Sequence, residues 1–388
     1  MSVVTGKGYA MSSFDEAEFQ RLKGEIREWM DTRGEYWSER LERERQTPDE
    51  LWDEVRELGY LRLAAPVELG GYGLPFAKYL ELLEIMSRGH GSLRMVLHVS
   101  NGLWRSMAPH ANAEQTERFV KAQVSGAIKV AFTLTEPHNG SGADITCTVR
   151  REGDTYYLSG EKHMITFGVI SDYLLLFARE EGTRGYDGTV ALLVPAHGEG
   201  VENISMAPTM GLVATDHAHL IFKDAPVPVA NRLGAEGEGL AVAIGGFLVP
   251  SRISLAMSCV GLAQRALEES IARAQERVTF GKPIASRQAV AFRLAEMATD
   301  VAAARQLALH AASLWEADHS AGVAESSMAK LFCSEMLQRV TDSALNVAGG
   351  MGFFAGTIER IYRDARAQRF EEGTFEIQKM TISRELIK

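Results

Sequence analysis

The stretch AMSCVGLAQRALEESI (256–271) carries the pattern that decides the fold of the C-terminal part of the chain. Apolar or small residues return every three or four positions, which places them on one face of a helix. The same spacing recurs over 290–304 and over 333–347. Helices with one apolar face bury it by packing against one another. Residues 237–388 are therefore expected to form a helical bundle.

The middle of the chain, residues 129–236, has a different pattern. Short runs rich in Val, Leu, Tyr and Phe are separated by turn residues, which is typical of β-strands. The runs are Thr155–Leu158, Tyr173–Ala178, Thr189–Val194 and His219–Lys223. A small β-barrel or sandwich is the expected structure of this middle domain.

The N-terminal part, residues 1–128, again has helical spacing. One helix is expected to begin at Phe14 and another after Pro48, with a glycine-rich loop over 66–75. Helical spacing resumes over 76–108 and 112–125. The predicted fold is mainly α with a central β domain, in the order N-terminal helical domain, middle β domain and C-terminal bundle.

Composition and charge exclude several classes of protein. The 388 residues have a formal net charge of −10, which argues against binding to nucleic acid. The cysteines Cys147, Cys259 and Cys333 are sparse and form no CxxC pair, so reduced thiols in the cytoplasm are expected. The start lacks the apolar segment of a signal peptide, and no stretch approaches the roughly 18 apolar residues of a membrane span. No membrane partner is therefore expected.

Several common catalytic motifs are missing from the sequence. The glycines of GGYGLP (70–75) and GAEGEG (234–239) lack the strand and helix context of a dinucleotide fingerprint. No GxSxG, P-loop or HExxH occurs. His217 and His219 would share one face of a strand, but no partner ligand is evident, and no metal site is predicted.

Four segments carry more specific information about function. They are AFTLTEPHNGSGAD (131–144), GEKHMITFG (160–168), RVTFGKPIASRQ (277–288), and NVAGGMGF (346–353) together with FEEGTFEIQ (370–378). In order and spacing they resemble the motifs of the acyl-CoA dehydrogenase family, and the resemblance covers nearly the whole chain. It implies a C-terminal four-helix bundle, FAD bound between the β domain and the bundle, and a homotetramer.

A bound flavin ring needs hydrogen-bond donors, because its reduction builds negative charge near N1, O2 and N5. The resemblance assigns these contacts to the first two segments, with the hydroxyls of Thr135 and Thr166 as donors. The residues implied on this side are Phe132, Leu134, Thr135, Met164 and Thr166. Ser141 matches a family serine that contacts both the cofactor and the acyl carrier.

The pyrophosphate and adenosine of FAD need cations and a close approach of the backbone. Gly349 and Gly350 would allow that approach, because neither has a Cβ. The remaining contacts implied by the resemblance are Arg277, Thr279, Phe280, Arg287, Gln288, Asn346, Thr374 and Glu376. In the family, part of this set comes from a neighbouring subunit.

Glu372 is the predicted catalytic base. The family's reaction removes the α-proton of an acyl thioester while a hydride leaves the β-carbon for flavin N5. A carboxylate in a dry pocket is expected to have a raised pKa and so to be a better proton acceptor. The substrate carbonyl would bind the backbone N–H of Glu372, next to Gly373. Some family members carry the base just before Arg252, where this chain has Ser251.

Several positions depart from the family pattern. Met164 replaces a Trp and Phe167 an Asn near the flavin edge, two extra residues lie between Ser141 and Asp144, and Asn346 replaces a Gln. Val249 stands where an Asp contacts the CoA arm, which leaves room for a carrier-protein thioester. Arg252 stays a candidate for the pantetheine or acyl end. Glu371, usually an aromatic residue, is expected to point to solvent.

The resemblance predicts FAD-dependent α,β-dehydrogenation of an acyl thioester, with electrons passed to an electron-transfer flavoprotein. Ser141, Val249, Arg252 and Gly373 are the predicted substrate contacts. The alternative is a flavin-dependent oxidase or monooxygenase on the same fold. A non-catalytic flavin or thioester-binding protein would have a damaged base or cofactor site, and Glu372 is intact.

Overall fold

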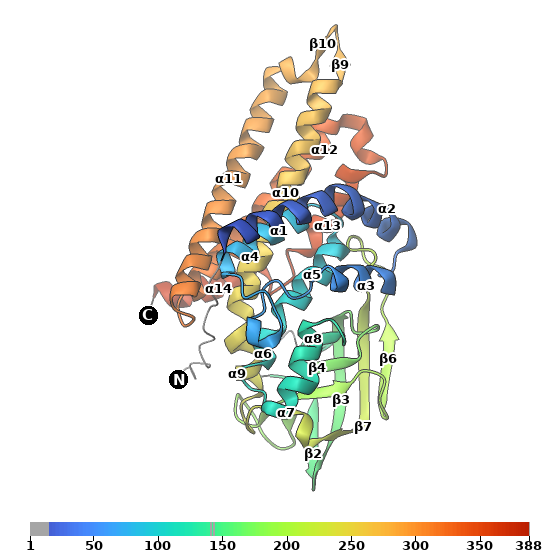
Figure 1. Cartoon of the computed structure of the whole chain (residues 1–388), viewed down its shortest axis with the longest axis vertical. Coiled ribbons are helices and arrows are strands. Elements are labelled where there is room, and N and C mark those ends of the chain that lie inside the picture. The colour runs from blue at the N-terminus through green and yellow to red at the C-terminus, as the bar shows by residue number, and fades with distance from the viewer. Residues whose placement is uncertain (1–14, 140–141, 143, 388) are drawn as a thin grey trace.

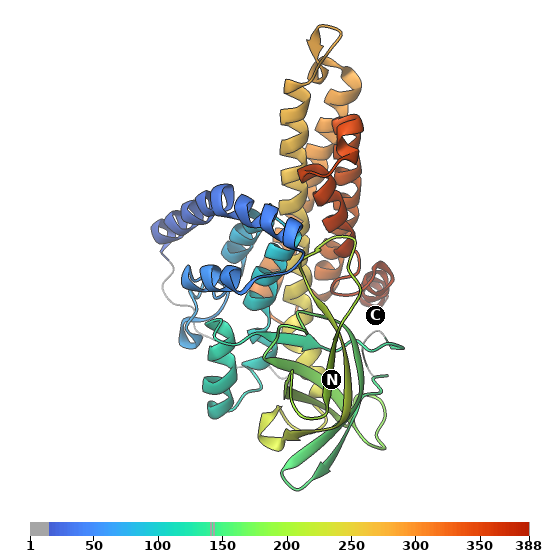
Figure 2. The same ribbon diagram turned by 90° about the vertical axis from the view of Figure 1, so that its right-hand side faces the viewer.

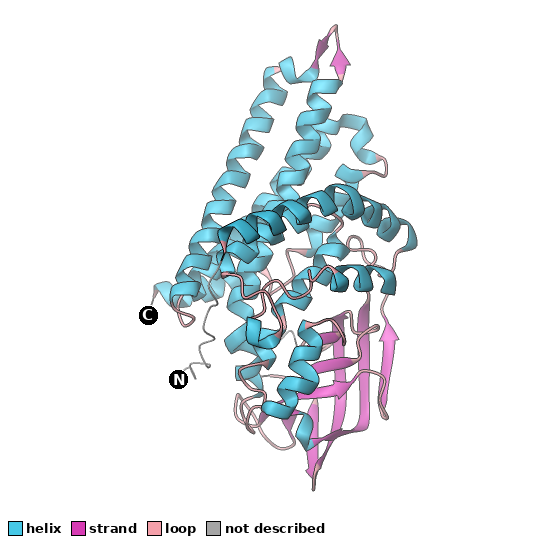
Figure 3. Ribbon diagram, in the orientation of Figure 1, coloured by secondary structure: helices cyan, strands magenta, loops and turns pink. Residues whose placement is uncertain are grey.

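The computed structural model describes residues 15–139, 142 and 144–387 (Figure 1). The N-terminal helices lie across the middle of the molecule, the sheet lies at one end, and the long C-terminal helices extend to the other (Figure 2). This confirms the expected order of a helical, a β and a helical part (Figure 3). Phe14, the expected start of the first helix, lies outside the described residues, and Asp15 caps the helix that begins at Glu16.

The N-terminal part is built from short helices around α4 and α5. Ten of the 12 residues of α5 are buried, because it lies between the other helices and the bundle. Any polar side chain on this helix therefore needs a partner inside the protein. The helices are α1 Glu16–Trp29, α2 Glu35–Glu44, α3 Asp49–Glu57, α4 Phe76–Met86, α5 Gly91–Gly102, α6 Trp104–Met107, α7 Ala113–Gln115 and α8 Lys121–Val124.

The β domain is one curved, mixed sheet with the strand order β6-β7-β3-β2-β4-β5-β8, in which β1 also pairs with β4. The predicted runs are confirmed, although β3 and β7 are longer than expected and their pairing is bulged between Lys162 and Ile165. Bulges of this kind bend a strand and re-aim its side chains. The strands are β1 Val130–Thr133, β2 Thr148–Glu152, β3 Thr155–Thr166, β4 Tyr173–Glu180, β5 Thr189–Pro195, β6 Val201–Ser205, β7 His217–Pro228 and β8 Arg232–Leu233.

The bundle consists of three long helices and two shorter ones. The long helices α10, α11 and α12 pack on one another, while α13 and α14 pack on α12 and complete the expected bundle. A small hairpin joins α10 to α11 at the tip (Figure 1). The elements are α9 Gly239–Ala243, α10 Val249–Glu276, β9 Val278–Thr279, β10 Lys282–Pro283, α11 Gln288–Ala317, α12 Val323–Ala348, α13 Thr357–Ala367 and α14 Phe375–Leu386.

The span Gly239–Glu276 is long and apolar enough to cross a membrane by length and composition alone. The expectation that no stretch comes near this limit is therefore wrong. Within the fold, 71% of its most apolar window is buried, because α10 packs against α4, α11 and α12. Its hydrophobicity is that of a core helix.

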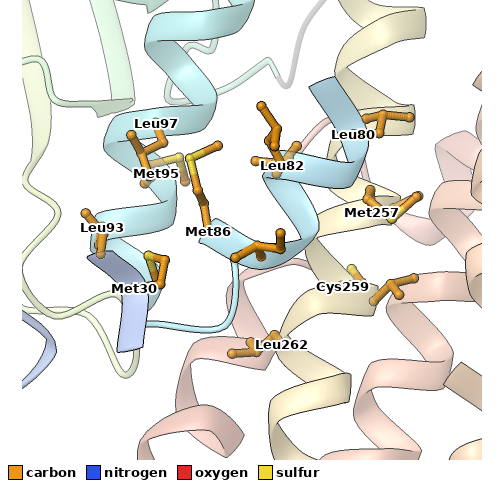
Figure 4. Packing of buried hydrophobic residues seen from close by; sticks show 14 of the residues in the cluster. Met30, Leu80, Leu82, Met86, Leu93, Met95, Leu97, Met257, Cys259 and Leu262 are labelled. Carbon is orange, nitrogen blue, oxygen red and sulfur yellow. The ribbon is translucent and has the colours of Figure 1, made fainter. Parts of the chain in front are cut away.

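One apolar core joins the N-terminal helices to the bundle. Side chains of α4 and α5 meet those of α10 in a continuous packed layer (Figure 4). The cysteines Cys147, Cys259 and Cys333 are buried and unpaired, and two of them belong to this core. Labelled members of the layer are Met30, Leu80, Leu82, Met86, Leu93, Met95, Leu97, Met257, Cys259 and Leu262.

Candidate active site

Glu372 lies in the loop between α13 and α14, where the chain reverses. Its φ is +55° and that of Gly373 is +97°, so two successive residues are left-handed. A Cβ at position 373 would lie 3.1 Å from the side-chain nitrogen of Gln378. Position 373 thus favours glycine for both its backbone angle and its close contact. The Glu372 side chain is only 15% exposed.

Two buried side chains hold the backbone of this loop. Lys330 Nζ donates to the carbonyl oxygens of Arg369 (2.9 Å) and Gly373 (2.8 Å). Gln378 Nε2 donates to the carbonyl oxygens of Glu372 (2.9 Å) and Gly373 (3.1 Å). Burial lowers the pKa of Lys330 to about 8. Sequence reasoning missed both roles, although a lysine within the apolar pattern of α12 was a detectable signal.

The Glu372 carboxylate is bound through one oxygen only. Ser251 Oγ donates to Oε1 at 2.7 Å, and His98 Nε2 lies 3.7 Å from the same oxygen. Oε2 has no hydrogen-bond partner among the described residues. That oxygen remains free to take up a proton.

The pKa of Glu372 lies below its usual value. Burial raises it, but the nearby polar groups of His98 and Ser251 and the charge of Arg252 outweigh burial, and the net effect is a lowered pKa. The expectation of a raised pKa is therefore wrong in this structure. That expectation took only burial into account. The side chains of α5 and α10 that lie near the carboxylate have the opposite effect on its pKa.

Glu371 points inward, so its predicted solvent orientation is wrong. Arg94 on α5 donates from Nη1 and Nη2 to the two oxygens of Glu371, each at 2.8 Å. The Arg94 side chain is 1% exposed. A buried guanidinium needs a counter-charge, and this requirement draws the carboxylate into the protein. The Arg94–Glu371 ion pair therefore holds the residue next to the base against α5.

Arg94→Met is expected to lower the free energy of unfolding by roughly 3 kcal/mol, because the Glu371 carboxylate would lose its partner. The double variant Arg94→Met with Glu371→Gln is the matched control and should recover part of the loss, since the orphaned charge is gone. Denaturant unfolding of the three proteins measures both effects. Equal stability of the single variant and the parent would contradict a structural role for this pair.

A buried ion pair joins the two β-domain segments implicated in flavin binding. Lys162 Nζ lies 2.9 Å from Glu136 Oε1, and the two side chains are 0% and 1% exposed. Lys162 also donates to the carbonyl oxygen of Leu134 (2.9 Å), while Glu136 accepts from the backbone N–H groups of Thr146 and Cys147. Both charges have hydrogen-bond partners beyond each other, as burial requires. Their role had not been inferred from the sequence.

The predicted flavin-contact residues of the β domain lie side by side. The backbone N–H of His163 donates to the carbonyl oxygen of Thr135 at 2.9 Å, which places Thr135 beside the end of β3. The backbone N–H of Thr135 has no acceptor among the described residues. Met164 is left-handed and 55% exposed at the bulge, and Thr166 follows it. A reduced flavin carries negative charge, so it requires hydrogen-bond donors, and an N–H without an acceptor at an exposed edge can serve as one.

Phe132 marks the border between the sheet and the bundle. Its ring stacks on that of Phe247, which precedes α10, with centroids 4.6 Å apart. Leu134 is buried beside it in the same apolar cluster. Ser141, which was predicted to contact cofactor and acyl carrier, lies outside the described residues.

The predicted pyrophosphate and adenosine contacts lie at the opposite end of α10. Arg277, Thr279 and Phe280 belong to the hairpin region at the tip, where the Phe280 side chain is 98% exposed. Helix α10 has 28 residues and is therefore about 42 Å long. Within one chain, this end cannot meet an FAD molecule at Phe132. Of the remaining members, Arg287 and Gln288 lie where the hairpin leads into α11, and Asn346, Gly349 and Gly350 lie at the C-terminal end of α12.

Of the predicted substrate contacts, Gly373 follows the base in the chain, and Arg252 Nε donates to the backbone oxygen of Glu372 at 3.4 Å. Val249 and Arg252 lie in the first turn of α10, and Arg252 Nη1 donates to Ser327 Oγ at 3.2 Å. Burial lowers the pKa of Arg252. Thr374 and Glu376 are exposed at the start of α14.

Comparison with known proteins agrees with this geometry. Family models described as the N-terminal, middle and C-terminal domains of acyl-CoA dehydrogenase match residues 16–127, 131–225 and 237–387. The chain is 35% identical to the caffeyl-CoA reductase-Etf complex subunit CarC of Acetobacterium woodii, over 90% of this chain and 92% of that protein. It is 34% identical to an acyl-CoA dehydrogenase of Bacillus subtilis, over 90% and 93% of the two chains.

A solved structure gives the same result. The crystal structure of a probable acyl-CoA dehydrogenase from Mycobacterium abscessus superposes with a TM-score of 0.91 at 30% identity, covering 97% of this chain and 100% of the other. Fold and site thus define a flavin-dependent oxidoreductase of thioesters. The chain belongs to the acyl-CoA dehydrogenase family, whose members use FAD to dehydrogenate acyl-CoA.

Proposed function

We propose that Glu372 is the base that removes the α-proton of the acyl-CoA. The observation that carries this proposal is a nearly buried carboxylate with one free oxygen, on a loop fastened by Lys330, Gln378 and the Arg94–Glu371 pair. A rigid backbone holds a base within reach of one substrate hydrogen. Bound FAD supplies the hydride acceptor for the β-hydrogen.

The backbone N–H of Glu372 is the proposed donor to the thioester carbonyl. It has no acceptor among the described residues. A donor of this kind stabilises the enolate character that develops as the proton leaves. Arg252, buried beside the loop, would orient the acyl or pantetheine end.

Anaerobic mixing with a panel of acyl thioesters tests the proposed function. Acyl groups of several lengths, linked to CoA or to a carrier protein, are mixed with the FAD-loaded enzyme while the flavin absorbance is followed. Bleaching without oxygen by at least one thioester is expected. Failure of every thioester to bleach the flavin would contradict the proposal. Fast reaction of the reduced enzyme with oxygen would identify the oxidase alternative.

An electron-transfer flavoprotein is the proposed redox partner. The name of the Acetobacterium relative describes it as the subunit of a complex with Etf. That relative is named a reductase, and the same base can return a proton to the α-carbon when electrons flow the other way. The redox partner would therefore set the direction of the reaction. We also propose that the enzyme acts in the cytoplasm.

A homotetramer is proposed, and the length of α10 supports the part of this proposal in which a neighbouring subunit contributes to each cofactor site. The flavin-side residues and the tip residues lie at opposite ends of this helix, so a neighbouring subunit has to bring Arg277 to the FAD of this chain. This arrangement completes each cofactor site with residues of two chains. Sedimentation of the FAD-loaded protein gives the subunit number.

Arg277→Ala is expected to weaken FAD binding by about 1.5–3 kcal/mol, the value of a hydrogen bond to a charged group. Arg43→Ala, at an exposed position of α2, is the matched control and should bind FAD like the parent. Titration of the apoprotein with FAD measures both. Parental affinity in Arg277→Ala would remove this residue from the cofactor site.

A further inference from the structure

Helix α5 presents two basic side chains to the two acids of the base loop. Arg94 and His98 are four residues apart, so they lie on the same face of the helix. Arg94 pairs with Glu371, and His98 faces Glu372. Both basic side chains are almost completely buried. One helix therefore contacts the base and the residue beside it.

A chain of two hydrogen bonds links His98 to the base. His98 Nε2 lies 3.2 Å from Ser251 Oγ, and Ser251 Oγ donates to Glu372 Oε1 at 2.7 Å. A hydroxyl has a single proton. Because Ser251 gives that proton to the carboxylate, its oxygen accepts from His98, and Nε2 of the imidazole carries a hydrogen.

This arrangement favours the ionised form of Glu372. Ser251 donates its hydrogen to Oε1, and a hydrogen bond donated to a carboxylate is stronger than one donated to the neutral acid, so it favours the charged form. Nδ1 of His98 is buried with no partner among the described residues. A neutral imidazole leaves only a lone pair unsatisfied there, whereas a charged ring would leave an unpaired N–H.

Other charges near the base do not touch its carboxylate. From α10, Arg252 Nε reaches only the backbone oxygen of Glu372, at 3.4 Å. From α12, Lys330 Nζ is bonded to backbone carbonyls. The neighbouring Glu371 is paired with Arg94. Burial lowers the pKa of His217 on β7, and the charge of Glu371 acts in the opposite direction by raising it. Among the described side chains, Ser251 makes the hydrogen bond to the carboxylate and His98 is the basic group near its oxygens, at 3.7 Å.

We propose that His98 is the positioning residue of the base: acting through Ser251, it holds one oxygen of Glu372 and keeps the carboxylate ionised, so that the other oxygen faces the α-proton. The inference rests on the proposed function of Glu372. It gives Ser251 a role in the reaction although serine cannot itself replace the carboxylate.

The pH dependence of anaerobic flavin bleaching tests this role. Without His98, burial of Glu372 is opposed by fewer contacts, so its pKa rises and the base is protonated at a higher pH. His98→Leu is therefore expected to lose bleaching rate as the pH falls from about 9 to about 6. The loss is about tenfold for each pH unit below the raised pKa of Glu372. The parent should change far less over the same interval.

Three further variants make the test specific. His98→Gln keeps an N–H donor near the position of Nε2 and should restore most of the parental profile. Ser251→Ala should shift the profile in the same direction as His98→Leu, and it serves as the test if His98→Leu does not bind FAD. His310→Leu, at an exposed position of α11, should follow the parent.

The outcomes separate this inference from the proposed function. If His98→Leu and Ser251→Ala bind FAD, bleach with substrate and show the parental pH profile, the role of His98 is overturned while the function of Glu372 stands. If the parent itself is not bleached by any thioester, the proposed function fails first. Melting temperatures and flavin content of each variant exclude a loss of folding as the cause.

Discussion

Glu372→Gln is expected to retain FAD while the rate of flavin bleaching by an acyl-CoA falls by about two to four orders of magnitude. The amide has nearly the shape of the carboxylate, so Ser251 can still donate to it, but it cannot accept the α-proton. The loop should keep its conformation, because Lys330 and Gln378 bind only its backbone. Anaerobic stopped-flow absorbance gives the rate, and the flavin spectrum gives the cofactor content.

A matched substitution separates the loss of the base from a general loss of charge. Glu57→Gln changes an exposed carboxylate on α3 and should leave the bleaching rate at the parental value. Bleaching of Glu372→Gln at a rate close to the parental one would place the base elsewhere in the protein.

Lys162→Met is expected to lower the free energy of unfolding by about 3–5 kcal/mol and to release FAD. The substitution leaves Glu136 charged at a position that is 1% exposed. It also removes the hydrogen bond to the carbonyl oxygen of Leu134, which holds the flavin-contact loop against β3. Denaturant unfolding and the flavin content of the purified protein measure the two effects.

The double variant Lys162→Met with Glu136→Leu tests the reason for this loss. Replacing both members of a buried pair with apolar residues is often neutral, whereas removing one member is costly. The double variant should therefore be more stable than Lys162→Met alone. A single variant as stable as the parent would show that the pair does not hold the two segments together.

The fold could be predicted from the sequence because its signals are local. The apolar spacing around Val260 and Leu267 defines the face of α10, and the run Tyr173–Ala178 defines most of β4. The lengths of β3 and β7 were underestimated, because the bulge near Met164 interrupts the alternation of their residues. The membrane-like hydrophobicity of α10 was also missed, since it spreads over a helix with a few polar positions.

The candidate base could be located from its motif, but its surroundings could not. Arg94 and Glu371 are 277 positions apart, and His98 and Ser251 are 153 apart. No local pattern connects such pairs, so Glu371 was expected to face solvent and the pKa of Glu372 to be raised. Both errors have the same cause. The polar residues of α5 meet Glu371 and Glu372 only when the chain has folded.

Exchange of the α-proton with solvent tests the central claim most directly, since it reports on the base without any transfer of hydride. The FAD-loaded enzyme is incubated in D₂O with an acyl-CoA that carries no transferable β-hydrogen, and deuterium at the α-carbon is followed by NMR. The parent is predicted to exchange this hydrogen, and Glu372→Gln to exchange it no faster than buffer. Equal exchange by the two proteins would contradict the assignment of Glu372 as the base.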